Sequence, residues 1–303
     1  MPSTHDYDFD ERNEDIKVCV NGEFFHRSEA KVSVMDSGYL LGDGVWEGIR
    51  LHKGHLIHLD AHLDRLFTGA ESIAMDIGLS REKMETVIRE TLEINEMESD
   101  VHLRLIVSRG IKKTPYQSPK VTIGKPTVVI IPEYKKVSEE VKKKGIVLAT
   151  VKTRRDHSIQ DPKINSLSKH NCISACIEAD RLGVDEGLML DPHGFVSTCN
   201  STNFFIIRDG EVWTSTGEYC LNGVTRASVI RLCREYDVPV FEKNFVVEDV
   251  YTADEVFVTG TFAGVIPVMS VDGEKIGDGI RGPITQNLQV WYALDIEKLT
   301  VDS

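Results

Sequence analysis

The most informative stretch of the sequence is Leu221-Asn222-Gly223-Val224-Thr225-Arg226, which directly precedes a predicted helix at residues 225–236. Its glycine allows backbone N–H groups to converge in a tight turn, and Thr225 adds a hydroxyl group at the first turn of the helix. A helix N-terminus has positive potential and unpaired N–H groups, so this stretch is suited to hold an anion such as a phosphate. The alternative is that Thr225 only caps the helix.

Two other segments carry groups of the same kind. The segment Val258-Thr259-Gly260-Thr261-Phe262-Ala263-Gly264 ends a predicted strand in small residues and hydroxyl groups. Arg65 lies in His62-Leu63-Asp64-Arg65-Leu66-Phe67, on a predicted helix. An arginine on an amphipathic helix is usually a surface residue, so Arg65 by itself predicts no site.

Composition and charge narrow the classes of function. The chain has 303 residues, enough for one large domain or two modest ones, and its 41% hydrophobic and 27% charged residues are typical of a globular protein. Its 35 basic and 48 acidic residues give a net charge of −13, which argues against non-specific nucleic-acid binding. The apolar stretches are of strand length, whereas a membrane-spanning helix needs about 20 apolar residues. Residues 1–14 are polar and acidic, unlike a secretory signal, so we expect a cytoplasmic protein that binds no membrane.

The cysteine and histidine patterns predict no metal site. The six cysteines form no C-x-x-C pair, so we expect reduced, partly buried thiols at Cys19, Cys172, Cys176, Cys199, Cys220 and Cys233. Four histidines lie close together in the sequence, at His52, His55, His58 and His62, but no H-E-x-x-H pattern includes them. We expect surface or packing roles for these histidines.

The order of strands and helices predicts two lobes. Many strands are joined by hairpins and mixed with helices, which is typical of an α+β (mixed α/β) fold rather than a doubly wound sheet. No G-x-G-x-x-G follows a strand into a helix, so a Rossmann site is not expected. The predicted divisions are an acidic tail (1–15), a smaller N-terminal α/β domain (16–132), a linker (133–144) and a larger C-terminal domain (145–303).

Turn signals and apolar periodicity locate the individual elements. Asn21-Gly22 is typical of a type I′ turn and predicts a hairpin from strands 17–20 and 23–26. Apolar residues at helical spacing predict helices at 59–75 and 80–95. Further strands are expected at 49–52, 55–58, 101–108, 127–132, 145–150, 186–190, 204–208, 211–214, 255–259 and 265–271, and a further helix at 166–182.

Taken in order, the motifs resemble those of the class IV (fold type IV) aminotransferases, which include branched-chain and D-amino acid aminotransferases. Any one motif is weak, whereas the ordered set, which covers residues 18–292, is specific. The motifs are Asp36-Ser37-Gly38-Tyr39, Gly42-Asp43-Gly44-Val45-Trp46-Glu47-Gly48-Ile49-Arg50, His62-Leu63-Asp64-Arg65-Leu66-Phe67, Asn222-Gly223-Val224-Thr225-Arg226, Gly260-Thr261 and Gly282-Pro283.

The resemblance implies a two-lobed homodimer with pyridoxal 5′-phosphate between the lobes. It implies that the phosphate is held by Arg65, by the backbone and hydroxyl of Val224-Thr225, and by Thr261, because a dianion needs several charge-assisted donors. The remaining cofactor-binding positions that it implies are Thr198, Asn203, Leu221, Gly223 and Gly260. The substrate-binding positions are Arg104, near the substrate carboxylate, Trp46, at an aromatic position of the pocket, and Phe262 and Ala263.

One position departs from the family pattern. Relatives have two lysines in a stretch like Asp-Pro-Lys-Ile-Lys-Ser-Leu-Asn, and the second forms the Schiff base; here Asn165 occupies that position. Lys169 lies at i+4 from Asn165 and would project from the same face of a helix, where relatives often have a tyrosine that touches the cofactor. We therefore expect Lys169 to form the Schiff base. The alternatives are Lys163, which would share the face of Asn165 on an incoming strand, and a protein without Schiff-base chemistry.

A second departure concerns the cofactor's ring. Relatives usually carry a glutamate at the position of Thr198, and it keeps the pyridine nitrogen protonated. Threonine is neutral and cannot supply that counter-charge, so we expect a weaker electron sink unless another acid or a water replaces it.

The sequence therefore predicts a pyridoxal-phosphate-dependent transaminase that exchanges an amino group between an amino acid and a 2-oxo acid, nearest to the branched-chain enzymes. A D-amino acid or (R)-amine transaminase is the alternative within the same reaction class. A lyase of the aminodeoxychorismate type and a cofactor-binding homologue with altered catalysis also stay open, and Asn165 and Thr198 motivate the second of these.

Overall fold

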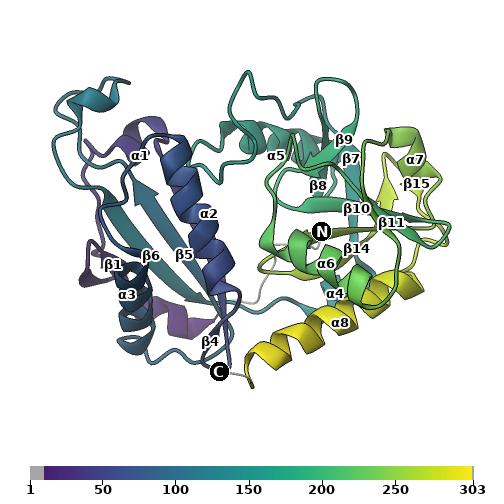
Figure 1. Cartoon of the computed structure of the whole chain (residues 1–303), viewed down its shortest axis with the longest axis horizontal. Helices are drawn as coiled ribbons and strands as arrows, with labels where there is room; N and C mark the ends of the chain where they lie inside the picture. The colour runs from purple at the N-terminus through teal and green to yellow at the C-terminus, as the bar shows by residue number, and fades with distance from the viewer. Residues whose placement is uncertain (1–9, 302–303) are drawn as a thin grey trace. The chain divides into compact units, whose positions relative to one another are not determined.

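The computed structural model describes residues 10–301, which divide into two compact units. The N-terminal unit holds residues 10–136 and 164–169, and the C-terminal unit holds residues 137–163 and 170–301. Each unit has its own sheet and its own hydrophobic core (Figure 1). The segment 164–169 therefore belongs to the N-terminal unit, although the residues on both sides of it belong to the other. None of the helices within residues 10–301 has the length and apolar character that crossing a membrane requires.

The N-terminal sheet has six strands in the order β2-β1-β6-β5-β3-β4, and all neighbours are antiparallel. Its strands are β1 (Lys17–Val20), β2 (Glu23–His26), β3 (Gly44–His52), β4 (His55–Leu56), β5 (Val101–Ser108) and β6 (Thr127–Tyr134). The predicted hairpin is confirmed, with φ of 55° at Asn21 and 85° at Gly22, as a type I′ turn requires. Strand β3 begins at Gly44, five residues before the predicted strand 49–52, because the glycines at 44 and 48 weaken the strand pattern.

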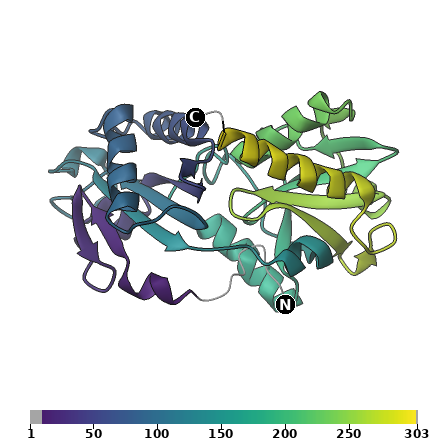
Figure 2. The same ribbon diagram turned by 90° about the horizontal axis from the view of Figure 1, so that it is seen from below.

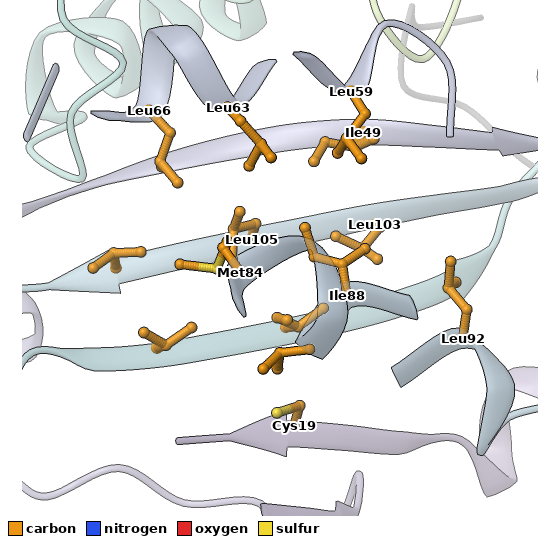
Figure 3. Close-up of a cluster of buried hydrophobic side chains, with 14 of the residues drawn as sticks. Cys19, Ile49, Leu59, Leu63, Leu66, Met84, Ile88, Leu92, Leu103 and Leu105 are labelled. Carbon is orange, nitrogen blue, oxygen red and sulfur yellow. The ribbon is translucent and has the colours of Figure 1, made fainter. Parts of the chain in front are cut away.

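Two helices cover one face of this sheet, α2 (Leu59–Ser72) and α3 (Arg81–Glu93). Leu63 and Leu66 of α2 and Met84 and Ile88 of α3 point toward the strands (Figure 3), and each is at most 1% exposed. Ser80 caps α3, since its hydroxyl oxygen accepts a hydrogen bond from an N–H of the first turn. The shorter elements of the unit are α1 (Ser37–Leu41) and two 3-10 turns (Glu11–Asp15 and Pro119–Val121).

Side chains alternate between the two faces of β3 and β5. Glu47 and Ile49 lie on the helix-covered face and are fully buried. The residues between and beside them, among them Trp46, belong to the opposite face of the sheet. Gly48 pairs with Arg104 of β5, so Arg104 belongs to the same face as Trp46.

The C-terminal sheet is mixed, with β12-β11-β10-β13-β14-β7-β8-β9 in that order and β15 paired with β14. Its strands are β7 (Ile146–Thr150), β8 (Glu186–Leu190), β9 (Val196–Cys199), β10 (Asn203–Arg208), β11 (Glu211–Thr214), β12 (Val240–Glu242), β13 (Glu255–Gly260), β14 (Gly264–Val271) and β15 (Glu274–Lys275). Its helices are α4 (Glu139–Lys144), α5 (His170–Leu182), α6 (Val224–Glu235), α7 (Val247–Tyr251) and α8 (Pro283–Leu299). Helix α8 packs beside α6 and along β14 (Figure 2).

Helix α4 lies in the stretch 133–144 that the sequence suggested as a linker. The stretch also contains the end of β6, and Val141 of α4 is buried in the C-terminal core. Lys142 and Lys144 pair with glutamates of the same helix. The charged helix is thus anchored to its unit through Val141, while its lysines and glutamates pair along its surface.

Helix α5 begins at His170, four residues later than predicted. The residues before it pair with β3 instead. Asn165 O accepts a hydrogen bond from Trp46 N (3.0 Å), and Leu167 N donates to Gly44 O (2.9 Å). Backbone groups that bond to a strand are not available to a helix, so the predicted helix over residues 166–169 is wrong.

Glu255 of β13 caps α8. Its carboxylate oxygens accept hydrogen bonds from the backbone N–H groups of Ile284 (3.0 Å) and Thr285 (2.8 Å). The N-cap residue, Gly282, has no side chain to serve as a cap, and a methyl group on it would lie 2.1 Å from Glu255 Cδ. A negative charge at a helix N-terminus is favourable, so Glu255 joins β13 to α8.

Replacing Glu255 with alanine should lower the free energy of unfolding by about 1–3 kcal/mol, because one buried and one partly buried N–H group lose their acceptor. Urea unfolding followed by tryptophan fluorescence measures this loss. The matched control is Glu274→Ala, on the exposed strand β15, which should change the free energy of unfolding by less than about 0.5 kcal/mol. Equal losses in the two variants would contradict the capping role.

Candidate active site

Lys169 and Asn165 are in contact in the N-terminal unit. Lys169 Nζ donates a hydrogen bond to Asn165 Oδ1 at 3.1 Å, and the asparagine is buried. Lys169 Nζ also lies 5.0 Å from the ring centroid of Trp46, at cation–π distance. The i, i+4 spacing on a helix that suggested this contact is absent, because both residues precede α5. The contact depends instead on the pairing of residues 165–167 with β3.

Arg104 lies against the same indole ring. Its guanidinium carbon is 3.9 Å from the ring centroid of Trp46. Burial lowers the pKa of the Arg104 guanidinium, and Glu133 opposes that shift. Arginine stays charged in proteins, so the Trp46 ring carries an exposed cation whose planar shape matches that of a carboxylate. His102 fills the space beside Gly48, where a methyl group would lie 2.9 Å from its Nε2.

Arg65 is engaged in a buried network with Glu47 and His62. Glu47 Oε1 accepts from Arg65 Nε at 2.8 Å, and Oε2 accepts from Arg65 Nη2 at 2.6 Å. His62 Nδ1 lies 2.7 Å from the same Oε2. Burial alone would raise the pKa of the Glu47 carboxyl, but the hydrogen bonds from Arg65 and His62 outweigh it and hold that pKa below its usual value. The network fixes the guanidinium of Arg65 at the sheet side of α2.

Glu47 has a structural role that the sequence motifs do not assign to it. Its signal was a carboxylate at an apolar position, since it alternates with Val45 and Ile49 on the core face of β3. A buried carboxylate needs partners, and the helix-borne His62 and Arg65 supply them. Surface or packing roles are expected for the four histidines, and His62 is the buried one of the four.

The N-terminus of α6 carries the predicted anion site of the C-terminal unit. Gly223 is the N-cap and provides no capping side chain. Asn203 Nδ2 donates to Leu221 O at 2.8 Å, and a methyl group on Gly223 would lie 2.2 Å from Asn203 Oδ1. Only glycine allows this close approach. The first turn, which includes the buried Thr225, is therefore shaped by Asn203 and has no side-chain cap.

The turn between β13 and β14 brings a second group of hydroxyls to the same unit. Gly260 pairs with Gly264, so Thr261, Phe262 and Ala263 form the turn. Thr259 pairs with Asn203 of β10, which puts their side chains on one face of the sheet. Among the residues from 10 to 301, the buried Thr259 Oγ1 has no hydrogen-bond partner.

Thr198 is buried and bonded to the backbone. Its hydroxyl donates to Thr202 O at 2.7 Å. Thr202 in turn donates through its own hydroxyl to Glu186 Oε2 at 2.8 Å. Glu186 is buried on β8 and was not singled out in the sequence. The acid nearest to Thr198 in this hydrogen-bond chain is therefore Glu186, and Thr202 links the two.

Lys163 forms an ion pair within its own unit. It belongs to the C-terminal unit, and its Nζ lies 3.1 Å from Glu218 Oε2 and 3.3 Å from Oε1. The N-terminal unit thus brings together Trp46, Arg104, Asn165 and Lys169. The C-terminal unit brings together Asn203, Leu221, Gly223 and the first turn of α6. Thr198 is hydrogen-bonded to the backbone of Thr202, the residue before Asn203. Within residues 10–301, no three His, Cys, Asp or Glu side chains group as metal ligands would.

Comparison with known proteins identifies similar chains. The sequence matches the family model of amino-transferase class IV over residues 44–271. A putative branched-chain-amino-acid aminotransferase of Methanocaldococcus jannaschii is 39% identical over 278 residues, which are 90% of this chain and 94% of that protein. Branched-chain-amino-acid aminotransferase-like protein 1 of Arabidopsis thaliana is 39% identical over 96% of this chain, which spans about half (52%) of that relative's length.

A solved structure has the same fold. The branched-chain amino acid aminotransferase from Thermoproteus uzoniensis, solved with norvaline, superposes with a TM-score of 0.84 at 30% identity, covering 95% of this chain and 96% of that one. A further branched-chain amino acid aminotransferase, solved with pyridoxamine 5′-phosphate, has a TM-score of 0.85 at 29% identity. These matches confirm the resemblance seen in the sequence and the mixed α/β fold of type IV.

Replacing Glu47 with glutamine should lower the free energy of unfolding at neutral pH by about 3–5 kcal/mol, because Arg65 loses its buried counter-charge. The pKa of Glu47 lies below the ordinary 4.5 in the folded chain, so its stabilisation is fully present above pH 4.5 and is lost as the pH falls below it. The difference between wild type and variant should therefore shrink in acid. Urea unfolding at several pH values measures it.

The matched control is Glu85→Gln, whose carboxylate pairs with Arg89 on the exposed side of α3. This variant should lose little stability at any pH, since exposed pairs contribute about 0–1 kcal/mol. A Glu47→Gln loss that stays constant from neutral to acid pH would rule out a charged Glu47 as the cause.

Proposed function

Because this chain belongs to the class IV aminotransferase family, we propose that it transfers an amino group between an amino acid and a 2-oxo acid. Branched-chain amino acids are the proposed substrates, since the Methanocaldococcus jannaschii relative is named as a putative aminotransferase for them. Pyridoxal 5′-phosphate is the proposed cofactor, supported by the related structure solved with pyridoxamine 5′-phosphate. The cofactor supplies an aldehyde that takes up the amino group and a ring that withdraws electrons from the substrate.

The donor groups of the C-terminal unit fit a phosphate. The first turn of α6 has no side-chain cap, and the close approach of Asn203 to Gly223 leaves no room there for a Cβ. Thr259 Oγ1, opposite Asn203, is a buried hydroxyl without a partner among residues 10–301. An uncapped helix N-terminus with neighbouring hydroxyls is a site for an anion. Val224, Thr225 and Thr261 are the proposed phosphate ligands here, whereas Arg65 is proposed from the family resemblance alone.

Lys169 is the proposed lysine of the reaction, and one observation carries this proposal. Its Nζ lies 3.1 Å from the side-chain oxygen of Asn165, the residue at the usual lysine position. The ammonium group of Lys169 thus lies beside the side chain of residue 165, the position from which relatives present their lysine. We propose that Lys169 holds the cofactor covalently between turnovers and moves the proton to and from the substrate's Cα. Asn165 orients this amine through its Oδ1.

Arg104 is the proposed partner of the substrate carboxylate. Its guanidinium lies 3.9 Å from the centroid of the Trp46 ring, and Lys169 Nζ lies 5.0 Å from the same centroid. The groups proposed to hold the carboxylate and to move the proton therefore flank one indole. Trp46 would form an apolar wall for a branched side chain and limit access of water.

The ring nitrogen would face a neutral environment. The Thr198 hydroxyl donates its hydrogen bond to Thr202 O, so it offers only lone pairs and no negative charge. Glu186 is linked to Thr202 by a hydrogen bond but not directly to Thr198. We infer that a cofactor bound to this chain would withdraw electrons from the substrate less strongly than in relatives with a glutamate at this position. Turnover would be correspondingly slower.

We also propose that the protein is a homodimer. Val34, Tyr39 and Ile123 are 70%, 72% and 64% exposed on the N-terminal unit. Their segments are neighbours, since Lys112 N donates to Met35 O and Ile123 N donates to Ile111 O, both at 2.9 Å. Exposed apolar side chains on adjacent segments favour burial against another chain, and a second copy of this one is the proposed partner.

A cytoplasmic location is proposed as well. The six cysteines are free thiols, of which Cys172 and Cys176 are partly accessible. Accessible free thiols are typical of a reducing compartment.

Substitution of Lys169 tests the proposed chemistry. After incubation with pyridoxal 5′-phosphate and reduction with borohydride, mass spectrometry of the wild-type protein should find the cofactor on the peptide that contains Lys169. Lys169→Ala should abolish this labelling, and transamination of L-leucine should fall by at least about 10³-fold, because the proton-transfer group is removed. Lys163→Ala is the matched control and should keep both the borohydride labelling and the transamination of L-leucine.

Moving the lysine provides a second test. The double variant Asn165→Lys, Lys169→Ala should regain labelling, now at residue 165. Labelling of Lys163 in the wild type, or no labelling of protein that binds the cofactor, would refute the role of Lys169. Comparing L- and D-enantiomers of leucine and valine as amino donors decides the stereochemistry, for which the L-forms are expected.

A further inference from the structure

The segment Asn165-Ser166-Leu167 occupies the free part of one edge of β3. Strand β5 pairs with β3 along one edge, whereas β4 pairs on the other edge only at Leu51 and His52. Ser166 forms an antiparallel bridge with Val45, and the two backbone hydrogen bonds to Trp46 and Gly44 flank it. Residues 165–167 thus act as a short extra strand, far in sequence from the strand they join.

Glycines make room for the side chain of Leu167. A methyl group on Gly44 would lie 2.7 Å from Leu167 Cδ1, and one on Gly38 would lie 3.3 Å from it. A methyl group on Gly42 would lie 3.1 Å from the Cα of Ser168. These distances are shorter than ordinary carbon–carbon contacts, so a side chain at any of the three positions would press on the segment. At Gly38 and Gly44 it would also clash with β5, whose Ser108 Cβ and Val107 O would lie 2.8 Å and 2.3 Å away. The glycine-rich stretch 38–44 therefore has a packing role toward residues 167–168.

This docking determines where Lys169 can reach. Lys169 lies two residues after Leu167, and α5 begins only after it, so no helix fixes its position relative to Asn165. We propose that Leu167, seated against Gly38 and Gly44, is a positioning residue that holds Lys169 Nζ at Asn165. The inference deepens the proposed function and rests on the role of Lys169 in it. Leu167 itself contacts neither reacting group in this proposal.

Leu167→Ala tests the inference with two cofactor forms. Pyridoxamine 5′-phosphate has no aldehyde, so its affinity reports noncovalent binding of the cofactor, whereas borohydride labelling with pyridoxal 5′-phosphate reports the reach of Lys169. We expect Leu167→Ala to reduce labelling of the Lys169 peptide by about tenfold or more, with less than about a twofold change in pyridoxamine 5′-phosphate affinity. Leu167→Met, which keeps the volume, should restore labelling.

Hydrogen exchange of the protein without cofactor gives a readout that does not depend on the chemistry. The amides of residues 165–168 should exchange faster in Leu167→Ala than in the wild type, because the segment loses its apolar contact. Leu79→Ala is the matched control, since Leu79 is a partly buried leucine that packs against the core of the same unit. It should leave exchange at 165–168 and labelling of Lys169 unchanged.

A pair of glycine variants tests the same contact from the other side. Gly42 and Gly54 both have left-handed backbone conformations, with φ of 67° and 79°, so alanine strains both positions alike. Only Gly42 faces Ser168, whereas nothing lies within 4 Å of a methyl group on Gly54. Gly42→Ala should reduce labelling of Lys169 and loosen residues 165–168, and Gly54→Ala should do neither. Circular dichroism verifies that each variant is folded.

The outcomes separate this inference from the proposed function. If Leu167→Ala and Gly42→Ala keep wild-type labelling and wild-type exchange, Leu167 is not a positioning residue. If the wild type itself shows no label on Lys169, the proposed function fails, and the positioning of a reacting amine fails with it. In that case faster exchange in the two variants would still show that the glycines and Leu167 hold the segment.

Discussion

The backbone pairing of residues 165–167 with the start of β3 is the constraint on which the candidate site depends. It brings a segment between two stretches of the C-terminal unit into the N-terminal unit. The pairing sets the backbone of Asn165 beside Trp46, and Lys169 then reaches the Asn165 side chain. Without it, nothing in the local sequence would keep an amine at this position, since α5 starts only at His170.

Strand β3 serves two kinds of electrostatic site because side chains alternate along it. On one face, Glu47 is buried with His62 and Arg65, and their hydrogen bonds keep the carboxyl ionised against the cost of burial. On the other face, the Trp46 ring lies beside two cations, Lys169 and Arg104. A one-residue shift of β3 would exchange these faces, so the register of β3 with β5 is essential to both arrangements.

The sequence predicted the elements that local signals control, such as the hairpin at Asn21 and the amphipathic helices α2 and α3. It also led to Lys169 as the neighbour of Asn165, but from a helical spacing that does not exist. The real cause is pairing with a strand about 120 residues earlier, which no local pattern reveals. The buried acids Glu47 and Glu186 were missed for the same reason, because their partners come from other elements.

A crystal structure of the protein grown with pyridoxal 5′-phosphate tests most directly whether Lys169 replaces the lysine that is missing at position 165. We predict continuous electron density between Lys169 Nζ and the cofactor, with the phosphate at the N-terminus of α6. Continuous density to Lys163, or a bound cofactor joined to no lysine, would contradict this role of Lys169.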